Sequence, residues 1–575
     1  MEVSNFSGRT RRRRRGGPLG KIFTFVLILV LGFASYKIYD HYSFTRERVD
    51  LNEYLKVSGD DVAIFINDNR YKSLLDHTPA IASNDTVYLS LSFVKTNLNN
   101  RFYHAKDLNR ILYSLIDETR SYGDGDIHQV GGAPYVKFLS EPYLLIDFVK
   151  DFTNIRYDKY VDDNYKRVYI YTDWDKEEIA YLSANESLRV LGGNKSKVIT
   201  DLKKGEEIKI LDNMTKWSKV KSSSGFIGYI RNSRIKNNIE VVPSSDFKEQ
   251  TKQKHIFGEK IVLGFHQMTQ IYNTKNLPDV LKNTKGMNVI SPTFFTLKNN
   301  DGEIRSLASA DYVKLCHNRG LKVWPTFTNF EIPEAKISIK EVFGSAIKRK
   351  KVIDKLIQQV NATGVDGINI DIESVPQSAG DDYIQFVREL SIAMSKINKV
   401  ISVDTFVPYE FNYHYNIKEL QFFCDYVIVM CYDEHYSGSK EAGSVSSIGY
   451  VADGINLTLR DVDKDKLVIA LPFYCRIWTT SPDGKVTSNA YGSQIAENSA
   501  ITQGLTFTFD DDTKQNYGSK VAQDGSKVEC WLEDNLSLAY KMELVRLADV
   551  AGTAAWKLTQ ERDTFFNIIN MNVDN

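Results

Sequence analysis

From Lys260 to the C-terminus the sequence repeats one pattern, in which a short apolar run is followed by a stretch of helical length. Eight such runs occur, and they are nearly continuous in apolar residues, as parallel strands buried on both faces are. Eight strands that alternate with helices predict a (β/α)8 TIM barrel rather than an open sheet. The runs are KIVLGFHQ, NVISPTFF, LKVWPTF, GINIDIE, VISVDTFV, DYVIVMCYDEH, KLVIALPFY and GTAAWKL.

The fourth run carries polar residues in strict alternation with isoleucine. Strand geometry places Asn369, Asp371 and Glu373 on one face and the isoleucines on the other, which we expect to face the helices. The amide and the two carboxyl groups then point into the barrel. Asp371 and Glu373 are roughly 6.6 Å apart along the strand, at ~3.3 Å per residue. Glu373 lies nearest the carboxyl-terminal rim, where barrel enzymes carry their chemistry. Burial and like charge would raise the pKa of at least one carboxyl, as a general acid requires. The alternative is a buried polar network without chemistry, which packing explains poorly.

The motif D-G-x-N-x-D-x-E resembles the D-x-x-D-x-D-x-E strand of glycoside hydrolase family 18. Met430-Cys-Tyr432-Asp433 is similar to the family's M-x-Y-D, and Trp556 stands where the family has its eighth-strand tryptophan. The seventh-strand segment Leu471-Pro-Phe-Tyr474-x-Arg-x-Trp478 also resembles the family. Asn369 departs from the chitinases, which usually have Asp there, whereas the bacterial branch directed at peptidoglycan and spore cortex often shows G-x-N-x-D-x-E.

The resemblance implies retaining, substrate-assisted hydrolysis of a β-glycosidic bond to an N-acetylated sugar, without a cofactor. Glu373 would protonate the leaving oxygen and later deprotonate water. Asp371 would hold the 2-acetamido N–H while the carbonyl oxygen attacks the anomeric carbon, which gives an oxazolinium ion. We also expect Asn369 to donate a hydrogen bond to Asp371, which would keep that carboxyl ionised.

The remaining site residues are also carried over from the resemblance. Tyr432 would hydrogen-bond the acetamido group, and Trp556 would form the floor beneath the sugar ring, although a barrel tryptophan is as readily a core residue. The other expected substrate contacts are Asn369, Met430, Asp433 and Tyr474.

The N-terminus has the charge pattern of a membrane anchor. Residues 1–21 hold six Arg, one Lys and one Glu, a charge of +6, and because the chain is formally neutral residues 22–575 sum to −6. The uncharged run 22–36 follows directly, so we predict a cytoplasmic basic arm, a transmembrane anchor and an exported body rather than nucleic-acid binding. Fifteen residues fall short of the ~20 that span a bilayer, so the flanking lysines would snorkel. Cleavage after Ala34 is the alternative.

Several domains are expected between the anchor and the barrel, because 575 residues exceed the ~250–300 that one core supports. Residues 37–60 look like a polar stalk. Residues 61–175 are short β-rich runs with one helical stretch near 105–118, an α+β module that resembles copper-amine-oxidase N-terminal-like modules and would serve as a spacer or in binding. Residues 186–240 predict a small closed β-barrel. It resembles the bacterial Src-homology-3-type domain, whose members often hold wall peptides, unless it is a spacer that binds nothing.

The cysteines and histidines indicate no metal site. The five cysteines are irregularly spaced without a CxxC, and the nine histidines include no HExxH, so we expect neither a disulfide framework nor a metal or cofactor. Residues 479–534 are too long for a simple βα loop, and long rim loops are normally functional. They would build one wall of a cleft, with Trp478 and Trp531 stacking on sugars unless both only pack within the loop.

These patterns predict a glycosidase held at the cell membrane of a Gram-positive bacterium, with its body outside. Its substrate would be an N-acetylglucosamine-containing glycan, peptidoglycan in preference to chitin-like oligomers. Two alternatives remain open. One is an inactive family-18-like lectin that grips wall glycans, although such proteins usually lose the acid at the position of Glu373. The other is a structural protein of a sporulation or division complex.

Overall fold

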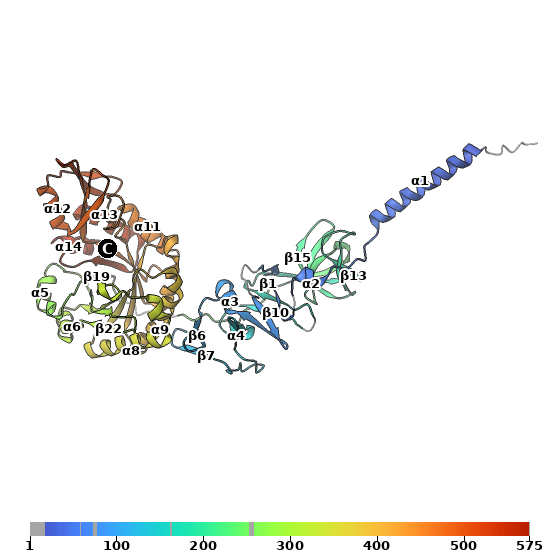
Figure 1. Cartoon of the computed structure of the whole chain (residues 1–575), viewed down its shortest axis with the longest axis horizontal. Coiled ribbons are helices and arrows are strands. Elements are labelled where there is room, and N and C mark those ends of the chain that lie inside the picture. Colours follow the sequence, from blue (N-terminus) through green and yellow to red (C-terminus); the bar gives the residue numbers. More distant parts are fainter. Residues whose placement is uncertain (1–17, 58, 73–77, 162–163, 252–257, 574–575) are drawn as a thin grey trace, which may run out of the picture. The chain divides into compact units, whose positions relative to one another are not determined.

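The computed structural model describes residues 18–573 except 58, 73–77, 162–163 and 252–257 (Figure 1). The first 17 residues of the predicted basic arm lie outside the described residues. The chain divides into two compact units. Residues 1–99 and 127–247 form unit 1, and residues 100–126 and 248–575 form unit 2.

Unit 1 contains the predicted anchor as a single helix, α1 (Pro18–Tyr42). Its 25 residues make about 37 Å at 1.5 Å per residue, more than the ~30 Å hydrocarbon core of a bilayer. The helix is longer than the predicted span 22–36 because it continues through the flanking lysines. In the described part of the chain it is the one helix long and apolar enough to cross a membrane, a test that a signal sequence also passes.

The predicted stalk, residues 37–60, is not an extended segment where the structure describes it, because residues 37–42 belong to α1 and residues 49–57 pack into unit 1. Helix α2 (Leu51–Leu55) is capped by Asp50, whose side chain accepts a hydrogen bond from the Asn52 N–H. Leu55 and Val57 are buried in a core that they share with the strands of the small β domain. Apolar residues in an otherwise polar segment explain why it does not extend freely.

That β domain is a seven-stranded sheet in the order β14-β13-β17-β16-β15-β12-β18. Neighbouring strands of this sheet are antiparallel, and β12 pairs with both β15 and β18. The strands are β12 (Glu177–Leu182), β13 (Glu186–Arg189), β14 (Val198–Leu202), β15 (Glu207–Asn213), β16 (Trp217–Ser222), β17 (Ile227–Arg231) and β18 (Ile235–Val241).

The rest of unit 1 has two four-stranded sheets and two short helices. One sheet is β10 (Arg156–Tyr160), β11 (Arg167–Tyr171), β1 (Ala63–Ile66) and β2 (Asn69–Arg70), in that order. The other is β3 (Ala80–Ser83), β4 (Thr86–Ser90), β9 (Pro142–Leu145) and β8 (Val136–Phe138). The helices are α3 (Leu91–Asn97) and α4 (Ile146–Asp151).

Residues 100–126 form a three-stranded antiparallel sheet that belongs to unit 2, and the helix predicted near 105–118 is wrong. Its strands are β5 (Phe102–Ala105), β6 (Arg110–Ser114) and β7 (Thr119–Tyr122). A turn at Asn109, which has a left-handed backbone (φ 49°), interrupts any helix there. Arg101 pairs with Glu419 at 2.9 Å, and the Tyr103 hydroxyl donates to Asp382 at 2.7 Å, so the sheet is packed against helices of the barrel.

Unit 2 is built around a TIM-barrel-like sheet, and each of the eight predicted runs contributes a strand. The second predicted run forms two short strands, β20 and β21, and the third forms β23 and β24. Because β20 pairs with β23 and β21 pairs with β24, the second and third runs lie side by side, and this joins the two ends of the sheet. The strands are β19 (Ile261–His266), β20 (Val289–Pro292), β21 (Phe295–Leu297), β23 (Lys322–Val323), β24 (Thr326–Thr328), β25 (Gly367–Asp371), β26 (Val400–Phe406), β27 (Tyr426–Met430), β28 (Leu467–Pro472) and β34 (Gly552–Trp556).

Helices cover the outside of this sheet, as Figure 1 shows for α8 and α9. The predicted orientation of the fourth strand is confirmed, because Ile368 and Ile370 belong to the core cluster that contains the helical residues Leu356 and Phe386. The helices are α5 (Leu277–Val280), α6 (Ala310–His317), α7 (Ile339–Phe343), α8 (Ala346–Thr363), α9 (Gly380–Lys396), α10 (Ile417–Phe423), α11 (Ile448–Thr458), α13 (Asn535–Ala548) and α14 (Phe565–Val573).

A second core cluster fills the inside of the barrel. It includes Phe265, Trp324, Tyr426 and Ile428, with Tyr432 and Trp556 packed against it. Gly367 is required at the start of β25, because a Cβ there would lie 2.7 Å from the Val400 carbonyl oxygen of the next strand. The motif glycine therefore allows β25 and β26 to approach closely.

The insertion between the seventh and eighth barrel strands is a separate five-stranded sheet with the order β30-β29-β33-β32-β31. It begins at Tyr474, five residues before the predicted boundary. Trp478 is only 1% exposed, which makes it a packing residue of this sheet. The ring of Trp531 lies 4.7 Å from that of Tyr517. The elements are β29 (Tyr474–Thr480), β30 (Val486–Gly492), α12 (Ser493–Thr502), β31 (Phe507–Asp510), β32 (Gln515–Val521) and β33 (Lys527–Leu532).

Candidate active site

Glu373 lies two residues beyond the last residue of β25, and its backbone is held by the side chain of Asn329. The Asn329 amide donates to the Glu373 carbonyl oxygen at 2.9 Å, and its Oδ1 accepts from the Glu373 N–H at 3.0 Å. Burial raises the pKa of Glu373 to about 7, and the charge of Asp433 adds to the rise. A carboxyl that is largely protonated up to neutral pH, on a fixed backbone, can act as a general acid.

Asn369 does not bind Asp371 as predicted. Its Nδ2 donates to Asp404 Oδ2 at 2.6 Å, and its Oδ1 accepts from the Ser402 hydroxyl at 2.7 Å. Asn369 is in register with Ser402 on β26, and Asp404 follows two residues later on the same face of that strand. Both hydrogen-bond partners of the Asn369 carboxamide therefore come from the neighbouring strand.

Asp371 and Asp404 are both buried acids of the barrel interior, at 4% exposure each. Burial raises the pKa of Asp371 well above its usual value, and the nearby charges of Asp404 and Glu373 raise it further. Burial likewise raises the pKa of Asp404. The expectation that Asp371 stays ionised through a bond from Asn369 is therefore wrong. Burial and like charge therefore disfavour the state in which both carboxyls are charged.

Predicted residues from the sixth, seventh and eighth strands lie around the same interior. The pKa of Tyr432 is raised by burial and by Asp404 and Asp371, which places its hydroxyl within electrostatic reach of both acids. The ring of Tyr432 lies 6.4 Å from that of Tyr474, whose hydroxyl donates to Asp433 Oδ1 at 2.5 Å.

Two further predicted substrate contacts differ in exposure and in their neighbours. Met430 is 6% exposed. Trp556 is partly exposed, and its ring lies 5.4 Å from that of Phe265.

Sequence reasoning missed Asp404 and Asn329. Asp404 alternates with Ser402 in the otherwise apolar fifth run, so the period-two argument used for the fourth run could have found it. Asn329 follows the third run on a rim loop, and nothing in its local sequence marks it as the residue that holds Glu373.

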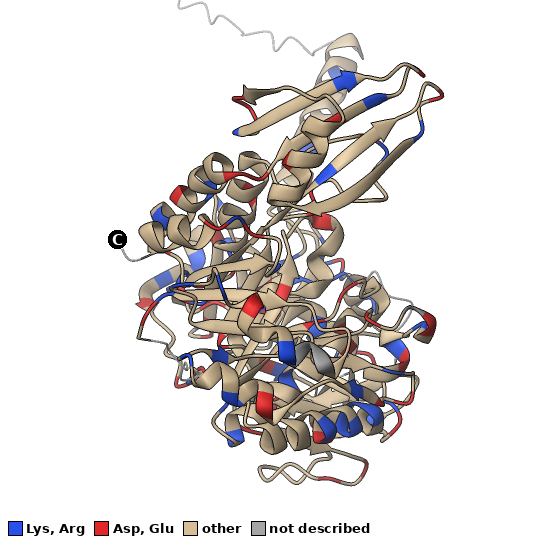
Figure 2. Cartoon of the chain, turned by 90° about the vertical axis from the view of Figure 1, so that its left-hand side faces the viewer, with Lys and Arg blue, Asp and Glu red and all other residues tan. Residues whose placement is uncertain are grey.

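No group of three or more His, Cys, Asp or Glu side chains arranged to hold a metal ion occurs among the residues that the structure describes. All five cysteines are buried. In Figure 2 acidic and basic residues are interspersed on the side of the chain that faces the viewer.

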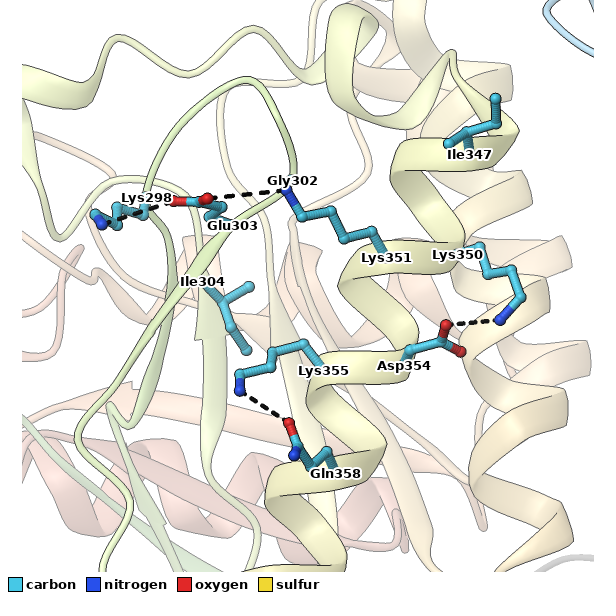
Figure 3. A pocket seen from close by; sticks show the side chains of 10 residues that line it. All are labelled: Lys298, Gly302, Glu303, Ile304, Ile347, Lys350, Lys351, Asp354, Lys355 and Gln358. Carbon is cyan, nitrogen blue, oxygen red and sulfur yellow. Dashed lines mark hydrogen bonds and ion pairs between the residues drawn. The ribbon is translucent and has the colours of Figure 1, made fainter.

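A hollow of 720 Å³ lies on the outside of the barrel, between α8 and the segment that joins β21 to β22 (Ile304–Ser306). Most of its charged groups pair with one another, as Figure 3 shows: Lys350 with Asp354 at 2.6 Å, and Glu303 with two further lysines, while Lys355 donates to Gln358. None of the predicted site residues lines it. The hollow is lined by Lys298, Gly302, Glu303, Ile304, Ile347, Lys350, Lys351, Asp354, Lys355 and Gln358.

Two family profiles match the chain. Glycosyl hydrolases family 18 matches residues 228–561, more than half of the sequence and the whole of the site described above. The bacterial SH3 domain matches residues 187–236, within the seven-stranded sheet of unit 1.

Individual proteins are similar at low identity. A glycosylase of Bacillus subtilis named YvbX, described as uncharacterized, is 23% identical over 302 residues, 49% of this chain and 84% of that protein. The cortical fragment-lytic enzyme of B. subtilis is 24% identical over 220 residues, 36% of this chain and 50% of that enzyme. The chain spans about half the length of most of the curated relatives that it matches. A chitinase structure from Chromobacterium violaceum has a TM-score of 0.49 at 19% identity, covering 55% of this chain and 99% of that one.

Proposed function

We propose that the chain, which belongs to glycosyl hydrolases family 18, is a glycosidase for N-acetylglucosamine-containing glycans and works by retaining, substrate-assisted catalysis. One observation carries the proposal. Glu373 has a pKa of about 7 on a clamped backbone at the barrel rim, and buried Asp371 lies two residues deeper on the same strand. One carboxyl is suited to proton transfer and the other to holding a polar group of the substrate.

In the first step Glu373 gives its proton to the glycosidic oxygen as the bond from that oxygen to the anomeric carbon breaks. The 2-acetamido carbonyl oxygen of the substrate forms the new bond to the same carbon, so the protein supplies no nucleophile. Asp371 accepts a hydrogen bond from the acetamido N–H and stabilises the positive charge that develops on the ring. Tyr432, within electrostatic reach of Asp371, would donate to the acetamido oxygen.

In the second step Glu373, now a carboxylate, takes a proton from water as that water attacks the anomeric carbon. The bond to the acetamido oxygen breaks, and Glu373 is protonated again. Two inversions at one carbon give net retention. Trp556, partly exposed at the end of β34, would lie under the sugar ring, with Asn369, Met430, Asp433 and Tyr474 around it as the remaining proposed contacts.

We further propose peptidoglycan as the substrate, in preference to chitin-like oligomers. Three observations support this choice. One matched relative is named a cortical fragment-lytic enzyme, a bacterial SH3 domain profile matches the chain, and α1 is long and apolar enough to cross a membrane. We propose that α1 is an uncleaved anchor that leaves the body outside the membrane of a Gram-positive cell. Under this proposal residues 186–240 hold wall peptides, while the copper-amine-oxidase-like module at 61–175 stays a prediction.

The test compares the full-length chain with its Glu373→Gln variant on purified peptidoglycan and, separately, on chitin oligomers. New reducing ends are identified by mass spectrometry. Loss of a positioned general acid should lower kcat by ~10²–10⁴-fold. The matched control is Asp354→Asn, an acid-to-amide change in the outer hollow. Unchanged hydrolysis by Glu373→Gln would contradict the mechanism, and products from chitin alone would contradict the wall substrate.

A second arm tests the role of the substrate's own acetamido group. The same glycans are offered after chemical removal of their N-acetyl groups. Because the acetamido oxygen is the proposed nucleophile, the deacetylated glycans should not be cleaved. Turnover of a fully deacetylated glycan at a comparable rate would rule out the substrate-assisted route while leaving Glu373 as the acid.

A further inference from the structure

Asp404 is a buried acid for which the proposed mechanism has no role. It enters the barrel interior from β26, and its Oδ1 atom is buried without a hydrogen-bond partner in the described part of the chain. Asp371 Oδ1, on the neighbouring strand, is also buried without a hydrogen-bond partner in the described part of the chain. A buried ionised oxygen without a donor is unfavourable, more so than a buried neutral polar group without a partner. Two such oxygens on adjacent strands therefore require a common explanation.

We propose that Asp404 is a positioning residue that shares one proton with Asp371, so that the pair carries a single negative charge while Asp371 holds the substrate. This inference rests on the proposed function. It assigns to the fifth strand a role in the reaction that no residue of the fourth-strand motif can fill, because Asn369 has no exchangeable acid proton.

The hydrogen bonds of Asn369 orient the pair. Its Oδ1 is occupied by the Ser402 hydroxyl, which fixes the carboxamide so that Nδ2 points to Asp404. Asp404 Oδ2 is thus an acceptor, and Oδ1 is the atom left to carry a proton. From Oδ1 the proton can be donated to Asp371, which satisfies both orphaned oxygens with one hydrogen bond.

The proton balance needs no outside group. Before substrate binds, the shared proton lies between the two carboxyls. When the Asp371 carboxylate accepts a hydrogen bond from the acetamido N–H, the proton stays on Asp404. When the product leaves, the two carboxyls share the proton again. The total number of protons on the pair is one throughout, and Glu373 keeps its own separate proton cycle.

The surroundings favour one charge over two. Two other acids of the described residues act on the pair. Glu373 raises the pKa of both Asp371 and Asp404, and Glu331, on the rim after the third strand, raises the pKa of Asp371. Among the residues that the structure describes, the groups that act on either carboxyl include no lysine or arginine. The other titratable groups that sense the pair are tyrosines from α9, from the turn before α10 and from the sixth strand, namely Tyr383, Tyr415 and Tyr432.

Infrared spectroscopy tests the shared proton directly. Full-length Glu373→Gln is compared with Glu373→Gln/Asp404→Asn near neutral pH, so that Glu373 contributes to neither spectrum. We expect a carbonyl band of a protonated carboxyl in the first protein that is missing from the second. Other buried acids with raised pKa, such as Glu533, cancel in the difference. An unchanged spectrum would overturn the proposal, since a merely structural Asp404 carries no proton.

Kinetics of full-length single variants supply a second readout, with the glycan that the wild type cleaves as probe. Asp404→Ala removes the donor to Asp371 and should lower kcat on the order of 10²-fold with little change in KM. Asp404→Asn can still donate to Asp371 and accept from Asn369, so it should recover much of that loss. If Asp404→Ala does not fold, the Asn variant and the infrared difference decide. Wild-type kcat in both variants would overturn the proposal.

The two proposals fail in distinguishable ways. If the wild type cleaves no glycan, or if Glu373→Gln is fully active, the proposed function is wrong. If Glu373→Gln is inactive while the Asp404 variants keep wild-type kcat and the infrared difference is absent, only the shared proton is wrong. Asp354→Asn again serves as the control for an acid-to-amide change away from the site.

Discussion

Asn369 donates a 2.6 Å hydrogen bond to Asp404 on the adjacent strand, and so ties the fourth and fifth barrel strands together deeper in the barrel than Glu373. The contact joins a residue of the family motif to one outside it. It leaves Asp371 without the neutral donor that the motif alone suggested, in a site where burial raises the pKa of both Asp371 and Asp404. The ionisation of this site is therefore set by pairs across the sheet.

Replacing Asp433 should move the alkaline limb of the pH profile. Burial is the main cause of the raised pKa of Glu373, about 7, and the charge of Asp433 adds to it. A general acid works only while protonated, so activity is lost as pH rises through that pKa. Asp433→Asn removes the like charge, lowers the pKa and should shift the limb of kcat to lower pH. Asp433→Glu keeps the charge and should restore it. A limb that does not move in the Asn variant would show that Asp433 does not act on Glu373.

Asn329→Ala should lower kcat more than it changes KM. The variant removes both hydrogen bonds that hold the Glu373 backbone, at 2.9 and 3.0 Å. Because a misplacement of about 1 Å can cost on the order of 10²-fold, we expect a loss of that size in kcat and a smaller change in KM. Asn329→Asp can accept from the N–H but cannot donate, and should be no better. Steady-state kinetics on the cleaved glycan measures both constants, and equal losses in Asn329→Ala and a distant surface variant would contradict the role.

Asp404→Asn should make the protein more stable, and more so at high pH. The folded-state pKa of Asp404 lies above its unfolded value, so its contribution to stability falls as pH rises from the unfolded pKa through the folded one. A neutral amide lacks this penalty, and each pKa unit corresponds to about 1.4 kcal/mol. Unfolding in denaturant at pH 5 and pH 8 measures the gain relative to wild type, with Asp354→Asn as the control. An equal gain at both pH values would mean that Asp404 does not titrate between them.

Arg101→Ala should loosen the sheet formed by β5, β6 and β7. Burial raises the pKa of Glu419, but the charges of Arg388 and Arg101 outweigh it and the pKa is lowered. Removing Arg101 should cost about 1.5–3 kcal/mol, the range for hydrogen bonds to charged groups. A carboxyl with a depressed pKa stabilises above its unfolded pKa, so the difference from wild type should shrink as pH falls below about 4.

Amide hydrogen exchange of residues 102–122 measures this loss locally, which suits a chain of several domains. Arg120→Ala is the matched control, because Arg120 pairs with half-exposed Glu118 at the surface. A surface ion pair contributes about 0–1 kcal/mol, so the control should show little change. Protection that is the same in Arg101→Ala as in the wild type would show that the pair with Glu419 does not hold the sheet.

The sequence by itself determined the features that depend on local periodicity. Eight apolar runs alternate with helical stretches, and each run became a barrel strand. Period-two alternation in the fourth run put the isoleucines against the helices and left Asn369 and Asp371 facing inward, because side chains of a strand alternate whatever its neighbours are. An uncharged run bounded by lysines was enough to predict a helix able to cross a membrane.

Only the tertiary structure decided which residues meet across strands and between distant segments. Asn369 binds Asp404 because β25 and β26 are adjacent in a fixed register, which no window of the sequence contains. Asn329 holds Glu373 across 44 residues of chain. Residues 100–126 form strands that pack with the barrel although they lie within the predicted N-terminal module. Hydrogen bonds and pKa shifts depend on distance in space, and the fold sets those distances.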